Sequence, residues 1–137
     1  MKIDYLNETR ELTAEQIMAM HLTYLKSIAE MNLHTKVIDC VMTVPSFMTD
    51  TERRAMMDSA QIAGLNCLKL MNDTTAVALA YGLYHSSLPE PTEKPHIVVF
   101  VDLGYASLQC SAVSYHKGKL KMMATTFDNN LGLSYIS

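Results

Sequence analysis

Residues 97–107 read IVVFVDLGYAS. The apolar run at 97–101 is unbroken, and Asp102 and then Gly104 follow it. Five apolar residues in a row, three of them valine, predict a strand that is buried on both faces. In open α/β sheets, ligands bind beyond the carboxyl ends of strands, where an Asp can hold a metal, a water or a ribose. Gly104 would let the backbone come close to a bound group. Because Asp-x-Gly after a strand is common, the rest of the chain has to decide whether this one is a site.

The composition is that of one globular domain without a nucleic-acid-binding character. The chain has 137 residues, 49% of them hydrophobic and 18% charged, with a net charge of −3 and no basic run. Its cysteines (Cys40, Cys67 and Cys110) show no Cys-x-x-Cys pairing, which predicts free thiols in a reducing compartment. No signal peptide and no apolar run of about eighteen residues is present. We therefore expect a cytoplasmic protein, with the nucleus as an additional location.

Helix and strand signals alternate along the chain. Thr13 with Gln16 and Thr49 with Glu52 form two capping boxes, each predicting a helix start, and Gly64 is suited to end the second helix. Strands are expected at 37–44 and 67–71, with a possible strand end at 2–6, and another helix follows Asn72. After a Pro- and Ser-rich connection at 86–95, three strands are predicted at 97–102, 108–115 and 119–127, the last two joined by a short hairpin turn at 116–118.

Two carboxylates follow strands in this scheme, Asp73 and Asp102. Two acids on either side of a cleft are what metal-assisted phosphoryl chemistry requires. For Asp73 the alternative is a helix N-cap, which stabilises a helix by about 1 kcal/mol. The pattern alone favours the N-cap.

The ordered combination of short motifs resembles the heat-shock protein 70 superfamily, over nearly the whole chain from about Leu12 to Gly132. The resemblance implies an α/β fragment of the actin-like ATPase (ribonuclease H-like) fold, with strand–helix alternation followed by a three-stranded meander. It divides the chain into the second half of the lobe I core subdomain (1–88), a linker (89–95), the first strands of the lobe II core subdomain (96–133) and a tail outside the family pattern (134–137). The matching residues are Val44-Pro45, Asp50, Arg53, Asp58, Ile62-Ala63-Gly64-Leu65-Asn66, Asn72, Thr75-Ala76, Ala78-Leu79-Ala80-Tyr81-Gly82, Val101-Asp102-Leu103-Gly104, Ala124-Thr125, Asp128 and Leu131-Gly132.

Several details are similar to the heat-shock protein 110 branch of that family. These are Asp39-Cys40-Val41, Glu52-Arg53-Arg54, the string 61–68 and the string 74–82. The resemblance implies an ATP-binding chaperone that catalyses nucleotide exchange on heat-shock protein 70 and holds unfolded clients, with no nucleic acid or membrane as partner. The alternatives are an ATP-hydrolysing chaperone of the 70 class and, less favoured, an actin-like sugar kinase.

The family also implies roles for individual residues. Asp102 would help to hold magnesium-bound ATP or ADP through the metal's water shell, and Gly104, Tyr105, Ala106 and Ser107 would form the second phosphate-binding hairpin. Asp73 would replace the family's catalytic-site Glu. Pro45 and Arg53 would form the hinge that relays the nucleotide state to the substrate-binding part. The first phosphate hairpin and the adenine-gripping helices would lie outside this chain, so we expect little nucleotide affinity from the chain alone.

The phosphate hairpin departs from the usual Gly-Gly-Gly-Thr at Tyr105, Ala106 and Ser107. Two positions that need close backbone approach thus carry side chains, while Ser107 keeps a hydroxyl group. Asp73 is one methylene shorter than the usual Glu, and Leu133 stands where a second Gly is expected. These differences predict nucleotide binding with weak or absent hydrolysis.

Overall fold

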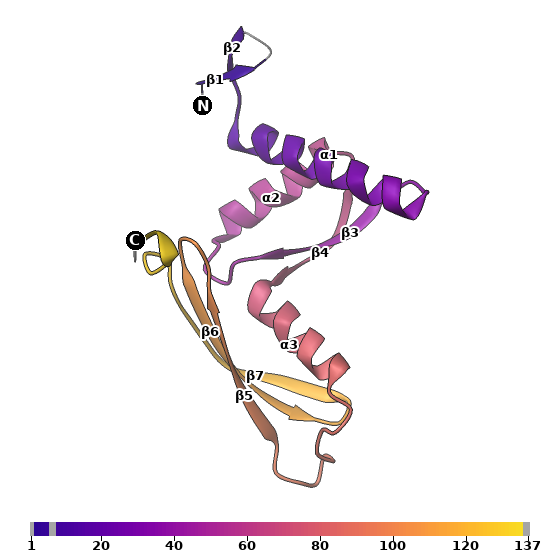
Figure 1. Cartoon of the computed structure of the whole chain (residues 1–137), viewed down its shortest axis with the longest axis vertical. Helices are drawn as coiled ribbons and strands as arrows, with labels where there is room; N and C mark the ends of the chain where they lie inside the picture. The colour runs from indigo at the N-terminus through magenta and orange to yellow at the C-terminus, as the bar shows by residue number, and fades with distance from the viewer. Residues whose placement is uncertain (1, 6–7, 136–137) are drawn as a thin grey trace. The chain divides into compact units, whose positions relative to one another are not determined.

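A computed structural model describes residues 2–5 and 8–135 (Figure 1). Its contacts divide the chain into two units, Met1–Met42 with Met48–Leu70 and Thr43–Phe47 with Met71–Ser137. The strand–helix alternation followed by three antiparallel strands confirms the predicted fold class. The elements are β1 (Lys2–Tyr5), β2 (Glu8–Glu11), α1 (Ala14–Leu33), β3 (Asp39–Val44), α2 (Asp50–Ile62), β4 (Asn66–Asn72), α3 (Asp73–Tyr84), β5 (His96–Leu103), β6 (Leu108–His116), β7 (Lys119–Asp128) and the 3-10 helix η1 (Leu133–Tyr135).

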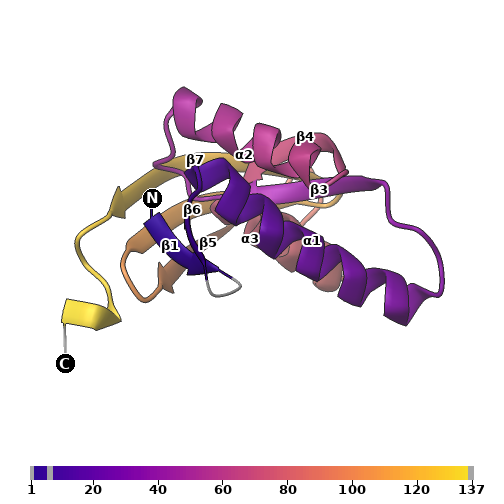
Figure 2. The ribbon, with the colours of Figure 1, turned by 90° about the horizontal axis from the view of Figure 1, so that it is seen from above.

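Helices α1 and α2 begin at the two predicted capping boxes and pack against each other (Figure 2). The Thr13 hydroxyl accepts a hydrogen bond from the Gln16 amide at 3.2 Å, and the Gln16 side chain accepts one from the Thr13 amide at 3.0 Å. Thr49 and Glu52 make the same reciprocal pair at 3.4 and 2.7 Å. Gly64, with φ of +68°, follows the end of α2. Both starts and this end were predicted correctly.

Strands β3 and β4 form a two-stranded sheet and are connected by α2. Figure 1 draws both arrows in the same direction. The Asn66 amide donates to the Ile38 carbonyl at 2.7 Å, and the Asn66 side chain donates to the Asp39 carboxylate at 2.7 Å. Along β3 the side chains alternate between exposed and more buried positions, with Cys40 and Val44 on the more buried face.

An N-terminal hairpin pairs β1 with β2, from Lys2 opposite Glu11 to Tyr5 opposite Glu8. The sequence predicted one strand end at 2–6 and no strand at Glu8–Glu11. The side chains of β2 are all exposed, so this strand has no apolar alternation to reveal it. Leu6, the last residue of the predicted segment, lies outside the described residues.

In the second unit, β5, β6 and β7 form an antiparallel sheet in that order. The turn between β6 and β7 is Lys117-Gly118, and Gly118 has φ of +72°, the left-handed conformation that the hairpin predicted. Pairing shifts once: Ala112 lies opposite Ala124 and Val113 opposite Met122. Met123 is therefore the extra residue of a β-bulge.

The core of the second unit lies between α3 and one face of this sheet. Ala78 of α3 packs with Val113 and Tyr115 of β6, and all three side chains are buried. The Tyr115 hydroxyl donates to the Ala78 carbonyl at 2.8 Å. Burial raises the pKa of Tyr115, with a smaller contribution from Tyr81. Around this centre lie Tyr81, Leu88, Val98, Phe100, Leu120 and Met122.

The prediction that the strand at 97–101 is buried on both faces is wrong. Val98 and Phe100 pack on the α3 side, but Ile97, Val99 and Val101 are 55%, 63% and 66% exposed. Helix α3 covers one face of the sheet, and no described residues cover the other. The unbroken apolar run therefore did not translate into two-sided burial.

The Pro- and Ser-rich connection between α3 and β5 is largely exposed. It is tied to the β6–β7 turn: the Lys117 amide donates to the Pro89 carbonyl at 2.8 Å, and the Lys117 ammonium lies 2.8 Å from Glu90. The elements on both sides of 89–95 belong to the second unit. The assignment of these sides to two lobes stays a prediction. None of the helices in the described part of the chain is long and apolar enough to cross a membrane.

Candidate functional site

The loop at 104–107 connects β5 to β6 and leaves backbone donors free. The Gly104 amide donates to the Ser107 carbonyl at 2.9 Å and closes the turn. The amides of Tyr105, Ala106 and Ser107 make no hydrogen bond to any other described residue. Successive free amides in a turn make a concavity that binds anions. The loop thus has the donors that a phosphate group requires.

The carbonyl groups of Gly104 and Tyr105 in the same loop accept hydrogen bonds from amides of η1. The Leu133 amide donates to the Gly104 carbonyl at 3.1 Å, and the Ser134 amide donates to the Tyr105 carbonyl at 2.9 Å. Gly132 is buried against the loop: a Cβ atom there would lie 2.4 Å from the Tyr105 carbonyl oxygen. Only glycine fits this approach. The sequence pointed to Gly132 as part of a family motif but gave no local signal of this contact.

Asp102 is the penultimate residue of β5, and its side chain is exposed. It lines a cavity of about 250 Å³ together with Thr74 and Gln109. The Gln109 side-chain oxygen already accepts hydrogen bonds from the Ser46 amide and hydroxyl at 2.8 and 2.7 Å. The Thr74 hydroxyl is buried and has no hydrogen-bond partner among the described residues. The cavity therefore offers a carboxylate and one unused hydroxyl group.

Asp73 is the first residue of α3 and is half-buried. The N-cap is Asn72, which makes no side-chain capping hydrogen bond, so the interpretation of Asp73 as the N-cap is wrong. An acid in the first turn is favourable toward the helix dipole. The structure brings Thr74, the residue after Asp73, into the cavity with Asp102. Asp73 itself is not among the residues that line this cavity.

The two predicted hinge residues lie in different units and are described separately. Pro45 follows the end of β3 and is half-buried. Arg53 lies on α2, where its Nε donates to the Met48 carbonyl at 3.1 Å. Arg53 thus helps to hold the chain that leads into its own helix. The hinge role of these residues stays a prediction.

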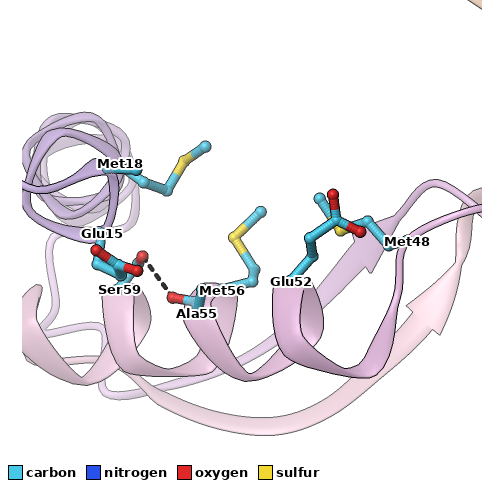
Figure 3. Close-up of a pocket in the computed structure, with 8 residues that line it drawn as sticks. Glu15, Met18, Met48, Glu52, Ala55, Met56 and Ser59 are labelled. Atoms are coloured by element: carbon cyan, nitrogen blue, oxygen red, sulfur yellow. Dashed lines mark hydrogen bonds between the residues drawn. The ribbon is translucent and has the colours of Figure 1, made fainter. Parts of the chain in front are cut away.

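A second cavity, which the sequence did not predict, lies between α1 and α2 (Figure 3). It measures about 190 Å³, and Met18, Met48 and Met56 line it. The Ser59 hydroxyl on its wall donates to the Ala55 carbonyl at 2.7 Å. Methionine side chains at such positions fill irregular gaps between helices.

The carboxylates of this second cavity are already used by the helix starts. Hydrogen bonds from the Thr49 amide and hydroxyl lower the pKa of Glu52. A hydrogen bond from its own amide, and then one from Thr13, lower the pKa of Glu15. The described residues that line this cavity therefore supply no spare acid or base, and we assign the cavity to helix packing.

The residues around Asp102 fit a magnesium-bound nucleotide. Among the described residues there is no group of three or more His, Cys, Asp or Glu side chains that could enclose a metal ion. Mg²⁺ in nucleotide sites needs no such cage, because one or two carboxylates, waters and the phosphates bind it. One strand-end carboxylate beside a loop with three free amides meets this requirement.

Comparisons with known proteins identify the family of this chain. The family model described as "Hsp70 protein" matches residues 1–134. The chain is 58% identical over 132 residues to the 97 kDa heat shock protein of Strongylocentrotus purpuratus. It is 56% and 55% identical to Heat shock 70 kDa protein 4 of Rattus norvegicus and of Homo sapiens. Each match covers 96% of this chain and 15% to 16% of the relative, so the chain spans about a sixth of the relatives' length. The chain belongs to the heat-shock protein 70 superfamily, in its heat-shock protein 110 branch.

Proposed function

We propose that this chain supplies one of the phosphate-binding loops in the nucleotide site of a heat-shock protein 110-type chaperone. The whole protein would bind magnesium-bound ATP or ADP, accelerate nucleotide exchange on heat-shock protein 70 and hold unfolded clients. The observation that carries the proposal is the loop at 104–107: three of its amides bond to no other described residue, and the loop follows β5, in which Asp102 is the penultimate residue.

The role proposed for each residue in nucleotide binding follows from its hydrogen-bonding groups that have no partner among the described residues. The amides of Tyr105, Ala106 and Ser107 would donate to phosphate oxygens. The Asp102 carboxylate would accept hydrogen bonds from the waters of the metal ion. Bound Mg²⁺ would neutralise the phosphate charge. Gly132 and the amides behind the loop would keep the loop in place while the nucleotide exchanges.

Weak hydrolysis is supported by the side chains that the loop carries. The Tyr105 side chain is 77% exposed and extends from a position where close backbone approach would favour glycine. Asp73 has a shorter reach than Glu, which weakens its ability to position an attacking water. The proposal is therefore of binding and exchange, with little turnover.

The test uses a chimera of Heat shock 70 kDa protein 4 from Rattus norvegicus, in which this chain replaces the matched segment. We expect the chimera to accelerate ADP release from a heat-shock protein 70 partner and to hydrolyse ATP slowly. Fast ATP turnover without accelerated ADP release would contradict the proposal and favour a hydrolysing chaperone of the 70 class.

A matched pair of variants separates the nucleotide site from the fold. Asp102→Asn in the chimera should weaken binding of magnesium-bound ADP by about tenfold, because a neutral amide cannot accept from the metal's waters in the same way. Asp58→Asn makes the same chemical change at an exposed position of α2 and should leave the affinity unchanged. Equal effects of the two variants would remove Asp102 from the site.

The chain alone offers a separate check. Because the resemblance places the other phosphate hairpin and the adenine-gripping helices outside it, we expect no measurable heat on titration with magnesium-bound ATP. A micromolar affinity would show that the loop at 104–107 suffices for binding.

A further inference from the structure

The register of β3 and β4 places Cys67 opposite Cys40. In a pair of strands running the same way, the amide of one residue bonds to the carbonyl that precedes its partner. The Asn66 amide donates to the Ile38 carbonyl, so Asn66 lies opposite Asp39, and their side chains are hydrogen-bonded at 2.7 Å. Since successive side chains point to opposite faces, the next pair is Cys40 and Cys67 on the other face.

The two thiols also influence each other. Burial is the main reason why the pKa of Cys40 is raised, and the neighbouring Cys67 raises it further through repulsion of the thiolate and a hydrogen bond. Asp39 adds a smaller repulsion. Neighbouring strands lie about 4.8 Å apart, which falls within the Cα separation of about 4.4 to 6.8 Å found in disulfides.

Small oxidants can reach this pair. Cys40 and Cys67 are free thiols, and both are only partly buried. Cys67 lines a surface cavity of about 490 Å³, along with Met57, Asp58 and Gln61 of α2. The Cys67 sulfur also lies 3.5 Å from the Lys69 carbonyl. Cys110 lies on β6 in the second unit.

We propose that Cys40 and Cys67 form an oxidisable dithiol, a modification site for hydrogen peroxide at the β3–β4 sheet. In the first step, one thiol takes an oxygen atom from peroxide and becomes a sulfenic acid, with release of one water. In the second step, the other thiol displaces hydroxide from that sulfur, the disulfide forms, and a second water leaves. The two thiols lose two electrons and two protons, and peroxide is reduced to two waters.

Cys67 is the thiol that reacts first, because it lines the cavity and because the raised pKa of Cys40 keeps that thiol protonated. Cys40 then resolves the sulfenic acid. The resulting bridge would join β3 to β4 and close the loop that contains α2.

The experiment treats the chain with hydrogen peroxide, blocks the remaining thiols with N-ethylmaleimide and digests it with trypsin without reduction. Cys40 lies in the peptide 37–53, and Cys67 lies in the peptide 55–69. We expect these peptides to be linked, with a mass about 2 Da below their sum, and to separate after treatment with dithiothreitol. The same digestion of the chimera described above tests whether these two peptides also become linked in a complete nucleotide-binding domain.

Oxidation in urea supplies the comparison that decides the proposal. From loop length alone, an unfolded chain would favour the Cys40–Cys67 link over Cys67–Cys110 by about twofold and over Cys40–Cys110 by about fourfold. In the folded protein we expect the preference to exceed roughly tenfold. A folded-state ratio no higher than the ratio in urea would overturn the proposal, and any higher ratio supports it.

Matched substitutions assign the link and the order of the steps. Cys67→Ser should abolish the link, and Cys110→Ser should leave it unchanged. With the partner removed, dimedone should label Cys67 in Cys40→Ser more strongly than Cys40 in Cys67→Ser. A link that persists in Cys67→Ser, or one lost in a folded Cys110→Ser, would overturn the assignment.

Discussion

Helices α2 and α3 start in different ways. At α2, Thr49 and Glu52 satisfy each other's backbone amides, and the Glu52 carboxylate also accepts from the Thr49 hydroxyl. At α3, Asn72 makes no side-chain capping bond, and the Thr74 hydroxyl is buried without a partner among the described residues. A helix start that completes its own hydrogen bonds serves the fold. The start of α3 leaves the Thr74 hydroxyl without a described partner, on the wall of a cavity that Asp102 also lines, so this hydroxyl is available for a ligand.

The loop at 104–107 combines both kinds of group in a single turn: some have hydrogen-bond partners within the fold, and others are available for a ligand. The carbonyls of Gly104 and Tyr105 accept hydrogen bonds from Leu133 and Ser134, whereas three of its amides bond to no other residue that the structure describes. One side of the loop is therefore structural and the other is available. Substitutions at these places and at the start of α2 should have effects of different size and sign.

The largest expected effect follows the substitution Gly132→Ala. The new methyl group would lie 2.4 Å from the Tyr105 carbonyl oxygen, so the loop would have to move. We expect a loss of about 1 to 3 kcal/mol in the free energy of unfolding, measured by urea denaturation. In the chimera, the affinity for ADP should fall as well.

Gly118→Ala is the matched control for that substitution. Gly118 has φ of +72°, but a Cβ atom there meets nothing within 4 Å. Its cost should be about 1 kcal/mol from backbone strain alone, with no change in ADP affinity. If Gly118→Ala weakened ADP binding as much as Gly132→Ala, the close contact behind the loop would not be the cause.

Thr49→Ala should have the next largest effect. It removes one half of the capping box at α2 and should cost about 1 kcal/mol of stability. The readout is helical ellipticity in the far ultraviolet during urea denaturation. Thr13→Ala should behave alike at α1, because the same reciprocal pair is lost there. Unchanged stability in both variants would mean that the boxes do not contribute.

Thr74→Val should act in the opposite direction. It replaces a buried hydroxyl group that has no described partner by a methyl group of similar shape. We expect stability to stay the same or to rise by up to about 1 kcal/mol, measured under the same conditions as for Thr49→Ala. A loss as large as that of Thr49→Ala would show that the Thr74 hydroxyl has a structural partner and would break the comparison between the two helix starts.

The smallest expected effect is the contribution of Glu52 to the pH dependence of stability. Hydrogen bonds from Thr49 hold the pKa of Glu52 below its ordinary value of 4.5. The stabilisation is therefore present above that ordinary value and is lost as the pH falls through the lowered value in the folded state. We expect Glu52→Gln to flatten the decline in stability between about pH 5 and pH 3, followed by circular dichroism. A wild-type slope retained in the variant would assign the decline to other acids.

The features that could be predicted from the sequence depend on neighbours in the chain. The capping boxes at Thr13 and Thr49 and the turn at Gly118 each need only a few consecutive residues. The strand β2 was missed because its exposed polar residues carry no alternation.

The features that could not be predicted depend on distant contacts. The exposed face of β5 depends on what covers the sheet, and the apolar run does not report that. The close approach of Gly132 to the loop at 104–107 joins segments about 25 residues apart, which no periodicity shows. The role proposed for Asp102 comes from a family resemblance. The Thr74 hydroxyl, which lines the same cavity and has no partner among the described residues, became apparent only in the structure.

The bulge at Met123 changes how an insertion or deletion in β7 would act. On the turn side of the bulge, Leu120 and Met122 lie opposite Tyr115 and Val113; beyond it, Phe127 lies opposite Gln109. The extra residue switches the core-facing side chains from even to odd numbers. The Phe127 ring lies 5.4 Å from that of Phe47 as a result. Deleting Met123 would therefore remove only the unpaired residue: Ala124 would follow Met122 directly and stay opposite Ala112, and Phe127 would keep its face opposite Gln109.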